Sequence, residues 1–203
     1  MNGVYFYWLA WSGWVLITFF MDKKHPYRRK WAIYLLTVII AAPYKDDFLF
    51  FQFHLSAFVI AGFIFLETRR KKTRTFLYLF LTSFIIMLAY TSFLMFELFD
   101  PVWVLFDRKF MLGAVGFYLA ILLHNEKRDR MLALITGFLA GDFLFSAVLW
   151  KFHFPYEVAS MTFMDILFIS SGMLIAWSAV EALISIMSKA TVKEAEGEEQ
   201  KTS

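Results

Sequence analysis

No cysteine occurs among the 203 residues, and only 18% of the residues are charged. Without cysteine the chain has no disulfide, no thiol nucleophile, no Cys-ligated metal and no palmitoylation site. A soluble domain is about 25% charged and about 45–50% apolar, whereas this chain is 60% hydrophobic and 21% aromatic. A domain of this size cannot hide that much apolar surface in its core. Lipid must therefore surround most of the chain, which excludes a soluble enzyme, a disordered protein and a secreted disulfide-linked domain.

Motifs that carry catalysis or bind cofactors are missing as well. The sequence has no Gly-x-Ser-x-Gly elbow, no His-Glu-x-x-His, no Walker lysine and no Gly-x-Gly-x-x-Gly. The four histidines do not repeat at the spacing of metal ligands. The basic residues lie in short runs between apolar stretches and form no separate basic domain, which argues against nucleic acid. We therefore expect no enzyme activity, no metal, no cofactor and no nucleic-acid partner.

Seven apolar stretches predict transmembrane helices, because about 20 apolar residues in a helix cross the hydrocarbon core of roughly 30 Å. The expected spans are 3–21, 31–44, 48–66, 75–99, 110–123, 131–150 and 159–187. The stretches are apolar at odd and even positions alike, which favours helices over the strands of a barrel. Residues 1–187 are therefore expected to form one all-α, polytopic transmembrane helix bundle with seven spans. Residues 188–203 are expected to form a polar cytoplasmic tail.

Lysine and arginine in short loops accumulate on the cytoplasmic side of a membrane, and this rule orients the bundle. The segments after spans one, three, five and seven hold five, five, three and three basic residues, which is 16 of the 20 in the chain. The N-terminus is thus expected outside and the C-terminus inside. The fourteen-residue span 31–44 is the weakest. A re-entrant segment there would remove the charge bias, so we expect it to cross, helped by snorkelling of Lys30 and Lys45.

Two aspartates fall inside expected spans, where a charged side chain costs roughly 2.5–3.5 kcal/mol on insertion scales. Asp142 lies near the middle of the sixth span, and Asp165 lies near the outer end of the seventh. They could form a pair that carries protons or binds a cation, or each could fix helix packing through its own hydrogen bonds. Gly137 and Gly141 form a small-xxx-small face that would let another helix approach closely.

Three further polar residues lie near the expected membrane boundaries. His54, in the outer third of the third span, is a candidate ligand or proton relay, although a hydrogen-bonded packing role is the simpler interpretation. Glu97 ends the fourth span, where it is either a hydrated rim residue or part of an outward-facing polar pocket with His54 and Asp165. Glu181, near the inner end of the seventh span, is expected to pair with the basic loop 127–130.

Three segments of the sequence carry a resemblance to a known family. They are Phe6-Tyr7-Trp8 with Thr18-Phe19-Phe20, then Phe96 to Trp103 (FELFDPVW), then Ile135-Thr136-Gly137 through Gly141-Asp142. Together they resemble the YphA family of small multi-pass membrane proteins from spore-forming Gram-positive bacteria. The resemblance implies a bacterial plasma membrane and no assigned activity. It places Glu97, Asp100 and Asp142 inside the recognisable segments.

These observations lead to one expected function and two alternatives. We expect an integral membrane protein without enzymatic activity, an assembly or scaffolding component of the cell envelope that contacts the lipid bilayer and a membrane protein partner or a second copy of itself. The main alternative is a small proton-coupled transporter or carrier that uses Asp142, Asp165 and His54. A lipid-modifying enzyme at the outer rim, acting through Glu97, Asp100 and His153, is the least favoured.

Overall fold

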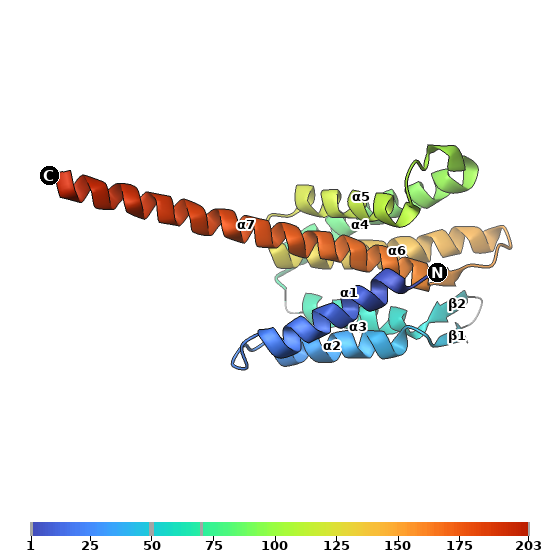
Figure 1. The fold of residues 1–203 in the computed structure, drawn as a ribbon. Coiled ribbons are helices and arrows are strands. Elements are labelled where there is room, and N and C mark those ends of the chain that lie inside the picture. Colours follow the sequence, from blue (N-terminus) through green and yellow to red (C-terminus); the bar gives the residue numbers. More distant parts are fainter. Residues whose placement is uncertain (1, 49–50, 70, 203) are drawn as a thin grey trace.

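Seven α-helices and a short three-stranded sheet make up the described part of the chain. A computed structural model describes residues 2–48, 51–69 and 71–202. The elements are α1 (Val4–Val15), the π-helical turn η1 (Leu16–Phe20), α2 (Arg28–Ala41), β1 (Lys45–Phe48), β2 (Phe51–His54), α3 (Leu55–Thr68), α4 (Thr73–Phe99), the 3-10 turn η2 (Pro101–Trp103), α5 (Arg108–Leu123), α6 (Lys127–Lys151), β3 (Glu157–Val158) and α7 (Met161–Thr202). The helices lie side by side along one direction, and the two termini lie at opposite ends (Figure 1).

The two ends of the bundle differ, and we name them by what they contain. The sheet end holds the N-terminus, strands β1 and β2, and the connections from α4 to α5 and from α6 to α7 (Figure 1). The basic end holds the connections from α1 to α2, from α3 to α4 and from α5 to α6. The loops that are rich in lysine and arginine therefore lie together at one end of the helix bundle, and the loops with few of them lie at the other.

Three helices are long and apolar enough to cross a membrane: Thr73–Phe99, Lys127–Lys151 and the Met161–Ser188 part of α7. They coincide with the predicted spans 75–99, 131–150 and 159–187. Val4–Phe20 and Leu55–Thr68 are apolar but shorter, and α5 has 16 residues where 110–123 was predicted. The all-α class predicted from the sequence is confirmed, whereas within the described residues only three helices have full spanning length on their own.

The predicted spans 31–44 and 48–66 need correction, because neither is one continuous helix. α2 ends at Ala41, and at 1.5 Å per residue its 14 residues reach only about 21 Å. Residues 45–48 form β1, which pairs antiparallel with β2 at 51–54, and α3 begins at Leu55. Residues 49–50 of the predicted third span lie outside the described residues. Each four-residue strand adds about 13 Å, so helix and strand together reach roughly the length of one crossing.

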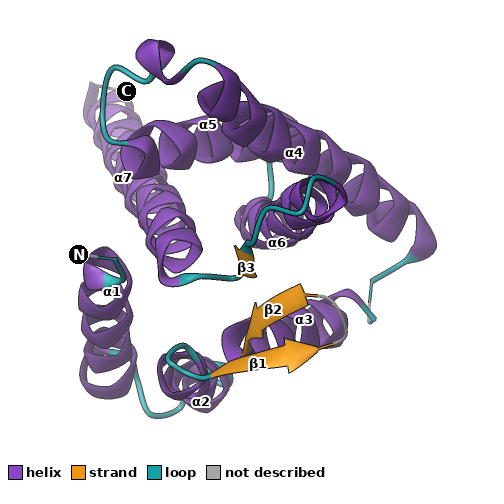
Figure 2. Cartoon of the chain, turned by 90° about the vertical axis from the view of Figure 1, so that its right-hand side faces the viewer, coloured by secondary structure: helices purple, strands orange, loops and turns teal. Residues whose placement is uncertain are grey.

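The local sequence favours strand β2, and the fold pairs its backbone polar groups on both sides. Phe51-Gln52-Phe53-His54 alternates aromatic and polar residues with the period of two that a strand requires. β2 is the central strand, with β1 on one side and the parallel strand β3 on the other. Non-helical backbone at membrane depth is tolerated where protein covers it and its polar groups are paired. β3 comes from the connection between α6 and α7, far away in the sequence (Figure 2).

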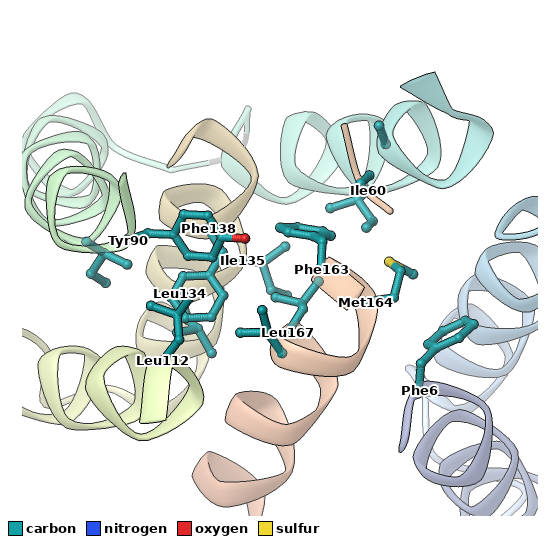
Figure 3. Packing of buried hydrophobic residues seen from close by; sticks show 14 of the residues in the cluster. Phe6, Ile60, Tyr90, Leu112, Leu134, Ile135, Phe138, Phe163, Met164 and Leu167 are labelled. Carbon is teal, nitrogen blue, oxygen red and sulfur yellow. The ribbon is translucent and has the colours of Figure 1, made fainter. Parts of the chain in front are cut away.

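The core lies around α6, which Figure 2 shows between α4 and α5 on one side and α3 on the other. Leu134 and Phe138 of α6 meet Tyr90 of α4 and Phe163 of α7 among the buried side chains (Figure 3). Thr91 of α4 also donates a hydrogen bond of 3.0 Å to the carbonyl oxygen of Gly141. The α4–α6 pair is thus held by both apolar packing and an interhelical hydrogen bond.

Gly137 and Gly141 lie on the face of α6 that contacts α4. A Cβ atom on Gly137 would lie 2.6 Å from Cβ of Ile86 and 2.9 Å from the carbonyl oxygen of Ser83. At Gly141 it would lie 2.9 Å from Cβ of Tyr90. The backbones of the two helices therefore approach as closely as these residues allow, which is the packing mode of small-xxx-small faces in membranes.

Replacing Gly137 with alanine is expected to destabilise the fold by about 1–3 kcal/mol, because an inserted methyl group forces the packed helices apart. The matched control is Gly62→Ala in α3, where nothing lies within 4 Å of the added Cβ, so it should leave stability unchanged or slightly improved. Denaturant unfolding of the purified protein in micelles measures both. Equal stability of the two variants would contradict the close α4–α6 contact.

α7 continues as a helix through the segment predicted as a polar tail, as far as Thr202. That segment is rich in alanine, glutamate and lysine, which favour helix. The helix projects past the ends of the other helices at the basic end (Figure 1).

Candidate functional site

Asp142 is fully buried in the half of α6 that leads to the sheet end, and three donors surround its carboxylate. The hydroxyl of Tyr156 donates to Oδ1 at 2.5 Å, and that of Tyr90 donates to the same oxygen at 3.1 Å. The backbone N–H of Ala159 donates to Oδ2 at 2.7 Å. We call Asp142 and these three donors the Asp142 site. It joins α4, α6 and the connection that leads to α7.

The sheet holds that connection over the end of α6. β3 pairs with β2 so that Gln52 lies opposite Glu157 and Phe53 opposite Val158. The next residue, Ala159, has a φ of 56°, a left-handed conformation that costs a non-glycine residue about 1–2 kcal/mol. This conformation accompanies the bond from its N–H to Asp142. Burial, and next the negative charge of Asp142, raise the pKa of Tyr156, so its hydroxyl stays a donor.

A second polar group, the ion cluster, consists of Lys45, His54 and Glu157, one from each strand. Lys45 Nζ lies 2.6 and 2.7 Å from the two carboxylate oxygens of Glu157. The buried ring of His54 places Nδ1 2.9 Å from the carbonyl oxygen of Ala42 and Nε2 3.1 Å from Glu157. Because both ring nitrogens face acceptors, both contacts are hydrogen bonds only when the ring carries two protons. Lys45 and His54 are directly opposite each other in the β1–β2 register.

Stability is expected to depend on pH through Glu157. The hydrogen bond from Lys45 lowers the pKa of this carboxyl below its ordinary value of 4.5, with a further bond from His54, while burial opposes the shift. The folded state thus binds the proton less tightly than the unfolded state, so this contribution is present above about pH 4.5 and is lost as the pH falls through the folded pKa. Thermal unfolding followed from pH 7 down to about pH 3 should show it.

Glu157→Gln is expected to remove the part of this pH dependence that Glu157 causes. Lys45→Met removes the main cause of the pKa shift, so it should flatten the same part of the curve. A wild-type slope below pH 5 that persists unchanged in both variants would contradict the role of the Lys45–Glu157 pair.

Asp165 is also fully buried, but its partners are different. It accepts hydrogen bonds from the backbone N–H of Gly3 at 2.9 Å and of Phe6 at 2.8 Å, and Lys109 Nζ lies 2.6 Å from its carboxylate. Gly3 is the N-cap of α1, with a φ of 89° that suits glycine. Asp165, a residue of α7, therefore caps the N-terminus of α1, where the helix dipole favours a negative charge. Its ion pair with Lys109 connects both helices to α5.

The predicted site residues thus separate into distinct groups. In the described part of the chain, Asp142 and Asp165 share no hydrogen-bond partner, so the hypothesis of a paired carboxylate site is not supported by the contacts. His54 and Asp142 do lie near one another, since they bind the adjacent residues Glu157 and Tyr156. Glu97 pairs with Arg108 at 3.5 Å rather than with His54 or Asp165.

A cavity of about 260 Å³ lies beside the Asp142 site. Tyr90 and Tyr156 form part of its wall, together with Arg108, Glu157 and Ser160. Asp142 itself is not in the lining, although two of its three hydrogen-bond donors, Tyr90 and Tyr156, are. Within the described residues no group of three or more His, Asp or Glu side chains is arranged to hold a metal ion.

Several partners were missed by sequence reasoning: Tyr90, Tyr156, Lys45, Glu157 and Lys109. Of these residues, Lys45 was expected only to snorkel at the end of the span 31–44. They could have been sought from the energy cost of an unpaired carboxylate in lipid. Because of this cost, each buried aspartate must have hydrogen-bond donors at its own depth in the bundle. The predicted pairing of Glu181 with the basic loop is confirmed, with Arg130 at 2.7 Å and Lys127 at 3.8 Å.

Comparison with known proteins gives one family and one named relative. The model of a family described as YphA-like integral membrane protein matches residues 2–201. The chain is similar to the "Uncharacterized protein YphA" of Bacillus subtilis (strain 168), with 24% identity over 153 residues, or 74% of each chain. No solved structure matches.

Proposed function

The chain belongs to the YphA-like integral membrane protein family, and on that premise we propose that it is a non-enzymatic assembly or scaffolding component of the cell envelope. The main support is that both aspartates inside the bundle are fully engaged by groups of the same chain. A carboxylate that holds three segments together is poorly suited to bind and release a substrate. The projecting part of α7 (Figure 1) provides a helical arm that a partner can bind.

We further propose seven membrane crossings in the plasma membrane, with the N-terminus outside and the C-terminus in the cytosol. The alternating direction of the helices along the bundle supports this arrangement (Figure 1). So does the gathering of basic residues at one end, since the rule of positive cytoplasmic loops places that end inside. The strands β1 and β2 extend α2 and α3 toward the sheet end and compensate for the short length of these helices.

Reconstitution into sealed vesicles tests the proposal. In vesicles, a scaffold is expected to produce no pH-dependent flux above that of empty vesicles. In a second experiment, crosslinking in cells, the protein is expected to be recovered from membranes in a complex larger than one chain. Recovery as a single chain only, without self-association or partner, would contradict it.

The alternative is a small proton-coupled carrier, and the cavity beside the Asp142 site favours it. Tyr90 and Tyr156 line the cavity, and their hydroxyls donate hydrogen bonds to Asp142. Hydrogen-bonded hydroxyls of this kind can pass a proton from the cavity to a buried carboxylate. If vesicles show a pH-dependent flux that Asp142→Asn abolishes while the variant remains folded, the carrier replaces the scaffold. The matched control is Asp100→Asn, which removes an exposed carboxylate at the same end of the bundle.

A further inference from the structure

A pocket of about 350 Å³ lies at the basic end, between η1, α2, α3, α6 and α7. Its volume is in the range of small-ligand sites, about 300–1,000 Å³. Most of its lining is apolar, and the apolar side chains come from every one of these elements, among them Ile17, Trp31, Phe63, Met131, Leu174 and Ile175. The pocket is therefore a place where several helices jointly leave apolar surface uncovered.

The first turn of α6 supplies a polar rim to this pocket, consisting of Lys127, Arg128 and Arg130. The side chains of Lys127 and Arg128 are 50% and 62% exposed, so their charges remain accessible. Arg130 is held in place by the carbonyl oxygen of His124 at 2.6 Å and by Glu181. No side chain caps the N-terminus of α6 at Glu126, and Asp129 in its first turn is paired with Lys71. The free N–H groups there retain the positive end of the helix dipole.

The positive charges at the rim exceed the negative ones. Glu67 is shared between Lys30 and Arg128, and Glu181 is shared between Arg130 and Lys127. In these contacts four cations share two carboxylates, and two of the contacts are long, at 3.4 Å for Arg128 and 3.8 Å for Lys127. Lys127 also donates to the carbonyl oxygen of Ser178 at 2.8 Å, and Arg128 lies over the ring of Tyr27. The ammonium and guanidinium groups have three and five donors, so each retains donors to bind an added anion.

We propose that this pocket binds an anionic phospholipid, with its phosphate on Lys127 and Arg128 and part of an acyl chain against the apolar wall. Apolar walls beneath a cationic rim match the two halves of such a lipid, and basic pockets between transmembrane helices are the sites where acidic headgroups bind. A free phosphate would use the rim alone. The inference requires only that the chain lies in a membrane, so it holds for a scaffold and for a carrier.

Native mass spectrometry of the full-length chain in detergent tests the site directly. Phosphatidylglycerol is expected to be retained about tenfold more than phosphatidylcholine, and glycerol 3-phosphate should not displace it. Equal retention of the two lipids, or displacement by glycerol 3-phosphate, overturns the proposal. Because this comparison uses the wild-type chain, it does not depend on any variant folding.

Two pairs of variants locate the site. Lys127→Gln with Arg128→Gln should lower phosphatidylglycerol retention about tenfold, whereas Lys23→Gln with Lys24→Gln, an exposed pair at the same end, should change it less than about twofold. Ile175→Trp should fill the pocket and lower retention without changing charge, whereas Ile186→Trp, outside the lining on the same helix, should not. Equal losses in the variants and their controls would show unspecific attraction and overturn the assignment.

Discussion

Replacing Asp165 with leucine is expected to destabilise the folded protein by about 3–5 kcal/mol, because it leaves a buried cation without its counter-charge. Lys109 is only 11% exposed and has its ion pair with Asp165. The same change also removes the acceptor for the backbone N–H groups of Gly3 and Phe6, so the first turn of α1 loses its cap. Denaturant unfolding in micelles measures the effect.

The double variant Asp165→Leu with Lys109→Met is expected to be more stable than Asp165→Leu alone, since it removes the unpaired charge together with its partner. Glu97→Gln serves as the control, because its contact with Arg108 is longer and more exposed, and it should cost less than about 1 kcal/mol. If the loss of stability in the double variant equalled the sum of the losses in Asp165→Leu and Lys109→Met measured singly, an ion pair between the two residues would be contradicted.

Replacing Asp142 with leucine is expected to cost about 3 kcal/mol or more, since its three donors, of which Tyr90 and Ala159 are buried, lose their acceptor at about 1–3 kcal/mol each. Asp142→Asn should cost less, because an amide oxygen can still accept from the tyrosines while its NH₂ group cannot accept from Ala159. Tyr156→Phe removes a single donor and should cost about 1 kcal/mol. Unfolding in micelles therefore should rank the three variants in that order.

Asp100→Asn is the control for this series. Asp100 is exposed and bonds only the nearby N–H of Val102 at 3.1 Å among the described contacts, so its replacement should change stability by less than about 1 kcal/mol. If Asp142→Leu proved as mild as this control, the Asp142 site would not hold the helices together.

Sequence patterns were sufficient to predict the structural class of the protein and to identify the aspartates whose burial in lipid would cost energy. Long apolar runs separated by basic loops predict a helical membrane bundle, since only the medium and the backbone pairing decide that outcome. The same cost argument singled out Asp142 and Asp165 as residues that either form a functional pair or fix helix packing. It could not name their partners, because Gly3 and Phe6 are far from Asp165 in the sequence and donate through backbone that every residue has.

The small sheet was beyond prediction for a related reason. The alternation of aromatic and polar residues at 51–54 covers only four residues inside a longer apolar stretch, so by itself it does not distinguish a strand from the start of a helix. Its strand conformation depends on pairing with residues 157–158, a contact between segments that the sequence does not connect. Because the sheet positions Glu157, Tyr156 and Ala159, the contacts of His54 and Asp142 could not be derived without it.

Placing the two ends of the bundle on opposite sides of the membrane tests the account most directly. The native chain has no cysteine, so a single cysteine in place of Leu105, exposed at the sheet end, or of Lys23, exposed at the basic end, reports one side each. With intact cells and a membrane-impermeant maleimide, Leu105→Cys is expected to be labelled, and Lys23→Cys only after the membrane is opened. Labelling of both positions in intact cells, or of Lys23→Cys alone, would contradict the proposed seven-span arrangement.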